Sequence, residues 1–336
     1  MTSGSLDRTI DHALDLTVAS TADPVAAVVR NGVVESVHHG HVVVLGPDGQ
    51  VQASVGDPDA VVLPRSSLKP VQAVAMLAAG LDLDGELLAL AAASHSGEPR
   101  HVDGVRRILA RAGLGEDALA NTPDLPLDAD AAAAWRAAGH GPERVVQNCS
   151  GKHAAMLATC VAAGWDTAGY LDPGHPLQRA VRQTVTEMTG DAVEHVAVDG
   201  CGAPLFSCTL AGLARAFARV AAAAADASDT SPPARVGRAM SAHPEYVGGT
   251  GRDVTLVMAG VPGLVAKDGA EGVYAVGLPN GSAAALKVLD GSQRPRPVVM
   301  AAALRRLGVD APVLREVGRV PVLGHGEPVG AVEALL

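Results

Sequence analysis

The order of strand and helix patterns along the chain constrains its fold most strongly. Residues 24–63 and 254–336 contain short β-branched runs separated by turn signals, whereas the segment between them carries apolar residues at helical spacing. Asn31-Gly32 and Asp48-Gly49 are dipeptides typical of tight hairpin turns, which indicates antiparallel pairing. We therefore expect one sheet built from both ends of the chain, with a helical part inserted between its halves.

These patterns define a fold class and a set of elements. The fold class is α/β in the α+β sense, with a mixed, mainly antiparallel sheet and a helical middle subdomain over roughly 103–250. Residues 1–22 are expected to be a flexible N-terminal segment and 23–336 a single domain. Helices are expected over 102–112, 129–138, 152–163, 176–189, 209–226 and 296–307. Late strands are expected at 255–258, 272–277, 283–289 and 330–332.

Composition limits the kind of protein. Hydrophobic residues make up 48% of the 336 residues but aromatic residues only 2%, so Ala, Val and Leu must fill the core. A net charge of −10 argues against a nucleic-acid partner. The chain shows neither the pattern of a signal peptide nor a run of ~18 apolar residues, which predicts no membrane association and a cytoplasmic location. In a reducing compartment, the four cysteines are expected as thiols or metal ligands rather than disulfides.

Three short patterns point to a serine hydrolase. Ser66 and Lys69 form an S-x-x-K, Ser-His-Ser follows at 94–96, and Lys-Asp-Gly at 267–269. The order matches S-x-x-K, S-D-N and K-T-G of serine acyl-enzymes. Such a site uses a serine nucleophile, an amine base and a second Ser–Lys pair, and predicts an amide hydrolase without a histidine base.

The surroundings of the first pattern suit this role. Residues 61–63 resemble a strand end, and apolar spacing predicts a helix over 67–79 that stops at Gly80. Ser66 and Lys69 would then share one side of the first helical turn. A capping serine followed by a solvated lysine is the plainer interpretation of this pattern alone.

A second cluster contains thiols. Cys149 and Lys152 are three residues apart at an expected helix start, and Cys201 lies in a Gly-rich turn. Two thiolates and a nitrogen suit tetrahedral zinc, although lysine must first lose its proton. Spacing alone favours the alternative, two buried structural thiols and a surface lysine.

Six segments together resemble one known family. They are PRSSLKPVQA, ASHSGEP, QNCSGKHAAML, VDGCGAP, GGTGRD and AKDGAEGVYAVGL. In this order, from about residue 24 to the C-terminus, they resemble the asparaginase II family of the Rhizobium etli type. The resemblance implies a fold similar to those of glutaminase and the serine β-lactamases. It also implies hydrolysis of the side-chain amide of L-asparagine, and a homodimer.

The resemblance also implies site residues. Ser66 and Lys69 match the family's catalytic pair, and Ser94 and Lys267 its second pair. The family's zinc site is matched by Cys149, Lys152 and Cys201, which implies Zn²⁺ as cofactor. The substrate pocket would contain Arg65, Asn148, Ser150, His153 and Asp199.

Two other functions remain open from the sequence. One is a penicillin-binding or β-lactamase-like serine acyl hydrolase, which the lack of a true K-T-G disfavours. The other is a zinc-stabilised protein that binds asparagine without turnover, which the retention of all the serines and lysines disfavours.

Overall fold

The central sheet joins the two ends of the chain. In the computed structural model, which describes residues 16–336, β1 (Asp23–Arg30) pairs with β12 (Glu327–Ala334), and β2 (Val33–Leu45) pairs with β1 and with β10 (Ala283–Val288). The strand order is β11-β12-β1-β2-β10-β9-β8, with β3 added beside β2. Each of these pairings is antiparallel. The prediction of a mainly antiparallel sheet built from both ends is confirmed, and the parallel pairs that a mixed sheet would contain are not found among residues 16–336.

The remaining strands are short. In the large sheet they are β3 (Val51–Val55), β8 (Val265–Gly269), β9 (Val273–Gly277) and β11 (Val320–Gly324). Two small ribbons pair β4 (Val61–Val62) with β7 (Cys208–Thr209), and β5 (Val196–Val198) with β6 (Pro204–Phe206).

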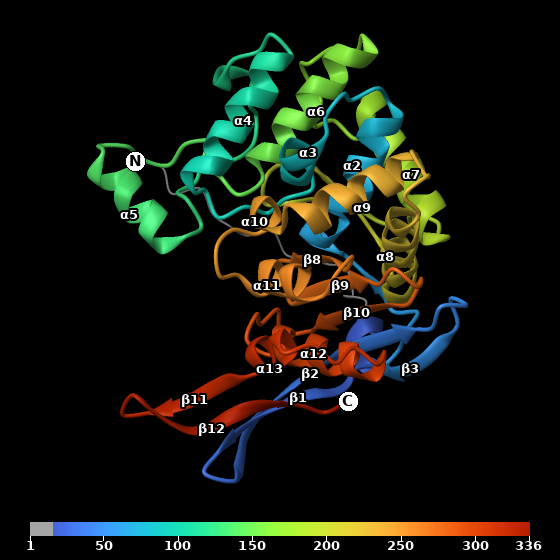
Figure 1. Cartoon of the computed structure of the whole chain (residues 1–336), viewed down its shortest axis with the longest axis vertical. Coiled ribbons are helices and arrows are strands. Elements are labelled where there is room, and N and C mark those ends of the chain that lie inside the picture. Colours follow the sequence, from blue (N-terminus) through green and yellow to red (C-terminus); the bar gives the residue numbers. More distant parts are fainter. Residues whose placement is uncertain (1–15) are drawn as a thin grey trace, which may run out of the picture.

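Helices lie on both faces of the sheet (Figure 1). The larger group comprises α2 (Lys69–Ala78), α3 (Gly85–Ala91), α4 (Pro99–Arg111), α5 (Ala129–Ala137), α6 (Ser150–Ala163), α7 (Pro176–Thr189), α8 (Leu210–Ala225), α9 (Pro232–Ala242), α10 (Pro244–Val247) and α11 (Asp253–Gly260). The other face carries α12 (Arg296–Arg306) and α13 (Val313–Val317). Helix α8 packs on β2, β9 and β10, whereas α12 contacts β9, β10 and β12.

The core is aliphatic, as the composition predicts. Val, Leu and Ala make up most of the buried residues, and Phe206 and Phe217 are buried among them. Small residues allow close packing where large ones are scarce. A Cβ atom at Gly277 would lie 2.1 Å from the carbonyl oxygen of Phe217, so α8 can approach β9 only because this position is glycine.

Most of the expected elements are present. The predicted helices correspond to α4 to α8 and α12, and the turn at Asn31-Gly32 has the positive φ angles, 48° and 80°, of a two-residue hairpin. The prediction of a strand at 255–258 was wrong, because these residues lie in α11. A run of four apolar residues does not distinguish a strand from a buried helix segment.

The division into subdomains stays a prediction. Helices α2 and α3 precede residue 103 and pack on α6 and α9, which lie within the predicted helical part. Of the predicted N-terminal segment, residues 1–15 lie outside the described residues, and Thr17–Ser20 form a short helix, α1.

All four cysteines are free, and no helix among residues 16–336 is long and apolar enough to cross a membrane.

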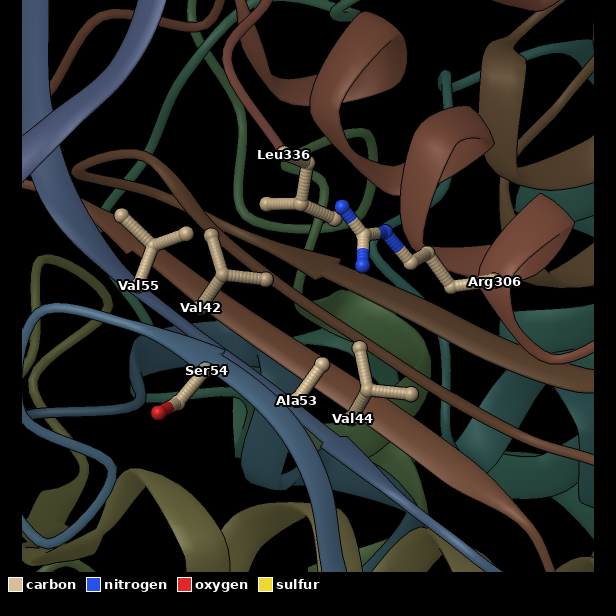
Figure 2. Close-up of a pocket in the computed structure, with 7 residues that line it drawn as sticks. All are labelled: Val42, Val44, Ala53, Ser54, Val55, Arg306 and Leu336. Atoms are coloured by element: carbon tan, nitrogen blue, oxygen red, sulfur yellow. The ribbon is translucent and has the colours of Figure 1, made fainter.

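The C-terminal residue packs on the sheet away from the predicted catalytic residues. Figure 2 shows the side chains of Val42, Val44 and Ala53 pointing toward Leu336 and Arg306, with Ser54 turned away. The cavity between them has a volume of about 50 Å³. None of the predicted site residues lines this cavity, so it belongs to the packing of the sheet.

Candidate active site

The S-x-x-K motif lies in a tight turn that leads into α2. Arg65 has a φ of +51°, which a non-glycine side chain rarely adopts, and a 3-10 turn, η1 (Arg65–Leu68), follows it. Such strain is typical of functional turns. Ser66 is half-buried, and within residues 16–336 its hydroxyl has no hydrogen-bond partner. The Ser66 hydroxyl is therefore available to a substrate.

The amine of Lys69 is fully buried and makes three contacts. Its Nζ donates to Ser94 Oγ at 3.0 Å and to the carbonyl of Ala93 at 2.5 Å, and it lies 3.1 Å from Cys149 Sγ. Lys69 is only 1% exposed. The structure thus brings the first motif, the second motif and the thiol cluster together at one amine.

Lys267 lies on β8 and contacts its own neighbour. Its Nζ donates to Asp268 Oδ1 and to the Asp268 carbonyl, each at 2.6 Å. Burial lowers the pKa of Lys267 to about 8; Lys69 and Arg252 act in the same direction, against the Asp268 carboxylate. The predicted contact between Ser94 and Lys267 is not among the hydrogen bonds of residues 16–336.

Strand β8 runs directly beside η1, the turn that carries Ser66. Ser67 Oγ donates to the carbonyl of Lys267 at 3.1 Å, and a Cβ atom on Gly269 would lie 2.8 Å from the carbonyl oxygen of Pro64. The glycine lets β8 approach the turn closely. Ser67 therefore supports the strand, which leaves Ser66 as the available hydroxyl of the pair.

The three predicted metal ligands lie together. Cys149 and Cys201 pack in one buried cluster with Ala203, and Lys152 Nζ lies 3.2 Å from Cys201 Sγ. A hydrogen bond from Cys201, with the charges of Lys69 and Lys152, holds the pKa of Cys149 well below its usual range. The same hydrogen bond, together with burial, raises the pKa of Cys201.

This donor set fits zinc. It offers two cysteine sulfurs, which zinc commonly binds, and one lysine nitrogen, which is a rare ligand; a tetrahedral ion would take a fourth ligand in addition. Burial acts to lower the pKa of Lys152, but the negative charges of Cys201, Cys149 and Asp199 outweigh burial and raise it. Zinc would therefore have to displace a proton. In the described part of the chain, no group of three or more His, Cys, Asp or Glu side chains is arranged to hold a metal. The predicted zinc site contains only two side chains of these types, Cys149 and Cys201, because its third donor is Lys152.

Arg65 and Asp199 form one side of the site. Arg65 Nε donates to Asp199 Oδ1 at 2.7 Å, and Arg65 Nη1 lies 3.8 Å from Glu271 Oε1. The carboxylate of Asp199 keeps a lowered pKa despite burial, because Lys152 and Arg65 are close to it. Arg65 directly precedes Ser66 in the chain, so this pair of opposite charges adjoins the S-x-x-K motif.

Two other predicted substrate residues, Asn148 and Ser150, form hydrogen bonds within the protein. Asn148 Oδ1 lies 2.9 Å from Gln147 Nε2 and 3.2 Å from Cys149 Sγ. Ser150 Oγ donates to Val145 and contacts His95, so its hydroxyl is already occupied. The structure thus places Asn148 against the thiol cluster and Ser150 inside the protein.

His153 has one free ring nitrogen. Its Nδ1 lies 2.8 Å from the hydroxyl of Tyr170, whereas its Nε2 is buried without a partner. Burial, together with the charges of Lys152 and Lys69, holds the pKa of His153 well below its usual range. A neutral imidazole therefore offers one nitrogen to a further ligand.

Two charged residues at the site were not predicted. Asp268 accepts hydrogen bonds from Lys267 and from Arg252, which also contacts the carbonyl of Ser94. Arg252 belongs to the GGTGRD segment, which carried the resemblance but received no role. The signal available in the sequence was an acidic residue directly after a predicted catalytic lysine, at the end of an apolar run.

The fold and the site together identify the class of protein. A mixed α/β domain that gathers hydroxyl, amine and thiol groups in one buried site is typical of an enzyme, and its family gives the class of amidohydrolase. The model of the L-asparaginase II family matches residues 26–334, so the chain belongs to this family. No curated protein matches it significantly.

Solved structures show a weaker similarity. A β-lactamase from Mycobacterium bovis is 16% identical, with a TM-score of 0.44 over 80% of this chain and 95% of that chain. A structure described as a putative β-lactamase from Bacteroides dorei has the same identity and TM-score, over 80% and 92%. The native form of Mglu is 15% identical, with a TM-score of 0.43 over 80% and 65%. At these values the similarity does not extend to activity.

Proposed function

We propose that the protein is an L-asparaginase, which hydrolyses the side-chain amide of L-asparagine to L-aspartate and ammonia. Membership of the L-asparaginase II family supports the substrate. The observation that carries the chemistry is the buried amine of Lys69, hydrogen-bonded to Ser94 and one helical turn from the unpartnered hydroxyl of Ser66. This arrangement provides a nucleophile, a base and a second hydroxyl in one place.

The reaction proceeds through an acyl-enzyme. The amine of Lys69 acts as the base and takes the proton of Ser66 as Ser66 Oγ bonds to the amide carbon, and the carbon–nitrogen bond then breaks. The leaving amide nitrogen receives a proton through the hydrogen bond between Lys69 and Ser94, and departs as ammonia. Water then cleaves the ester to release aspartate and restores the serine. Lys267 contributes a nearby amine that titrates close to neutral pH.

The remaining site residues would hold the metal and orient the substrate. Cys149, Lys152 and Cys201 would hold Zn²⁺, which supplies a fixed positive charge beside the site when bound. Arg65 and Asp199 would bind the α-carboxylate and α-ammonium groups, and Asn148, Ser150 and His153 complete the pocket wall or support it. We further propose that the protein acts as a cytoplasmic homodimer.

Ammonia release provides the test. Purified protein should release ammonia from L-asparagine faster than from L-glutamine, and should leave nitrocefin intact. Hydrolysis of nitrocefin without ammonia release would favour a β-lactamase-like acyl hydrolase instead. Saturable binding of asparagine in calorimetry, without ammonia, would favour a binding protein.

A further inference from the structure

Arg252 connects two predicted catalytic elements that lie far apart in the sequence. Its Nη1 donates to the carbonyl of Ser94 at 2.5 Å, and its Nη2 donates to Asp268 Oδ2. The other oxygen of that carboxylate accepts the hydrogen bond from Lys267 Nζ at 2.6 Å. One planar guanidinium thus contacts the backbone of the second serine and the carboxylate that holds the second lysine.

The loop that carries Arg252 is fixed against the Ser94 segment. Ser96 Oγ donates to the carbonyl of Gly248 at 2.9 Å, and the carboxylate of Glu98 accepts from Thr250 N at 2.6 Å. A Cβ atom on Gly249 would lie 2.2 Å from Ser96 Oγ, which only glycine avoids. The position of Arg252 is therefore determined by contacts on both sides of the loop.

We infer that Arg252 is a positioning residue, which fixes Ser94 and the Asp268–Lys267 pair relative to each other for the reaction. The inference rests on the proposed function, because it assigns Arg252 to that site. A guanidinium suits this role because its nitrogens donate in fixed directions, whereas a lysine offers a single nitrogen. Arg252 does not contact the predicted nucleophile, so it acts through the residues that it holds.

The charge of Arg252 also acts on Lys267. The charged groups that face Lys267 are Asp268, Lys69 and Arg252, and Asp268 is in turn contacted by Arg296 at 3.4 Å. The positive charge of Arg252 disfavours protonation of Lys267 by electrostatic repulsion. Its hydrogen bond to Asp268 also competes with Lys267 for the same carboxylate. Both effects favour the neutral amine, so loss of the guanidinium should make Lys267 harder to deprotonate.

The test measures the titration of Lys267 directly. The lysines of the chain are Lys69, Lys152, Lys267 and Lys287, so a protein labelled with ¹³C at the lysine ε-carbon gives a simple NMR spectrum. Lys267→Arg and Lys287→Arg variants assign the signals. The midpoint of the Lys267 protonation is then measured from the NMR signal as the pH is varied, in the wild type and in each variant. The pH dependence of kcat/KM for asparagine is measured over the same range, and the midpoint of its acidic limb is compared with that of Lys267.

Arg252→Gln should move the Lys267 midpoint and the acidic limb upward together, by about one pH unit, because a nearby positive charge is lost. Arg252→Lys keeps the charge and should leave the midpoint near that of the wild type. It should still lower kcat by roughly 10- to 100-fold, because a single amine cannot hold both partners in place.

Arg215 offers a matched control. It also joins a carboxylate, Asp191, to a backbone carbonyl, that of Thr189, each at 2.8 Å. Arg215→Gln should leave the Lys267 midpoint and the acidic limb unchanged. The inference is overturned if Arg252→Gln leaves both unchanged, if Arg215→Gln moves them equally, or if Arg252→Lys retains full kcat.

The two hypotheses can fail separately. Absence of ammonia release by the wild type would reject the proposed function, while the NMR titration would still show whether Arg252 controls Lys267. An active wild type with an unmoved titration in Arg252→Gln would reject the inference and leave the asparaginase function intact. If Arg252→Gln does not fold, a wild-type kcat in Arg252→Lys still overturns the inference.

Discussion

The amine of Lys69 lies 3.0 Å from the hydroxyl oxygen of Ser94, and this hydrogen bond joins two motifs that are 25 residues apart. Lys69 begins α2, whereas Ser94 follows α3 in an extended segment. The helices α2 and α3 pack on each other and on α6, which carries Lys152. The contact between Lys69 and Ser94 is therefore a product of helix packing.

Alanine variants of Ser66 and Ser67 show which of the two serines is the nucleophile. Ser66→Ala should lower kcat by roughly three orders of magnitude or more, because the acyl-enzyme cannot form, while the melting temperature stays near that of the wild type. Ser67→Ala is the matched control. It removes one hydrogen bond to Lys267 and should cost about 1 kcal/mol of stability but less than roughly tenfold in kcat. The reverse result would move the nucleophile to Ser67.

Zinc content tests the thiol cluster. Elemental analysis of protein purified without chelator should show close to one zinc per chain, and Cys149→Ala and Cys201→Ala should lose most of it, because three protein ligands cannot spare one. Cys160→Ala removes a buried thiol away from the cluster and should keep the metal. Equal zinc in all of these variants would place the metal, if any, elsewhere.

The pH profile tests Lys267. Its pKa is lowered to about 8 by burial, so its amine is protonated at lower pH and becomes neutral as the pH rises through that value. If neutral Lys267 is required, kcat/KM should rise with pH through about 8, as an essential base in the free enzyme does. Lys267→Met should abolish this limb, whereas Lys287→Met should keep it. A flat profile between about pH 6 and 10 in the wild type would exclude an essential lysine base with this pKa.

Asp268 is predicted to be essential for stability. It is 7% exposed and lies among Lys267, Arg252 and Arg296, whose positive charges hold its pKa well below the usual range. Asp268→Asn leaves these cations without their common partner and should reduce the free energy of unfolding by about 3–5 kcal/mol, measured in urea. Asp290→Asn alters the contact of a half-exposed carboxylate with His38 Nδ1 and should cost less than about 1 kcal/mol. Similar losses in both variants would contradict this role.

A variant of Gly269 tests whether the close approach of β8 to η1, the turn that carries Ser66, is needed for activity. Gly269→Ala would place a Cβ atom 2.8 Å from the carbonyl oxygen of Pro64 and 2.9 Å from Ser67 Oγ, so the strand or the turn must shift. A displacement of this kind should lower kcat by about 100-fold. At Gly141 an added Cβ meets nothing within 4 Å, and Gly141→Ala should keep the wild-type kcat. Full activity in Gly269→Ala would show that the contact does not position the site.

Local sequence determined the elements of the fold. Helical spacing predicts α6, α7 and α8 within a few residues, and Asn31-Gly32 predicts the first hairpin, because these signals depend only on near neighbours. Six short segments in their order along the chain, from PRSSLKPVQA to AKDGAEGVYAVGL, also sufficed to predict the family. The segment 255–258 was misassigned because its apolar run is compatible with either structure.

Tertiary packing decided which of the predicted site residues meet. The sequence paired Ser94 with Lys267, whereas in the fold the hydroxyl of Ser94 meets Lys69, and Lys267 meets Asp268. Arg252 reaches Ser94 across 158 positions of the chain, a contact that no local pattern encodes. Spacing along a helix or strand fixes the direction of a side chain, but the identity of its partner depends on how distant elements pack. The sequence therefore identified the serine, lysine and cysteine groups of the candidate site, whereas the packing of distant elements added Arg252 and Asp268 and determined how these groups are connected.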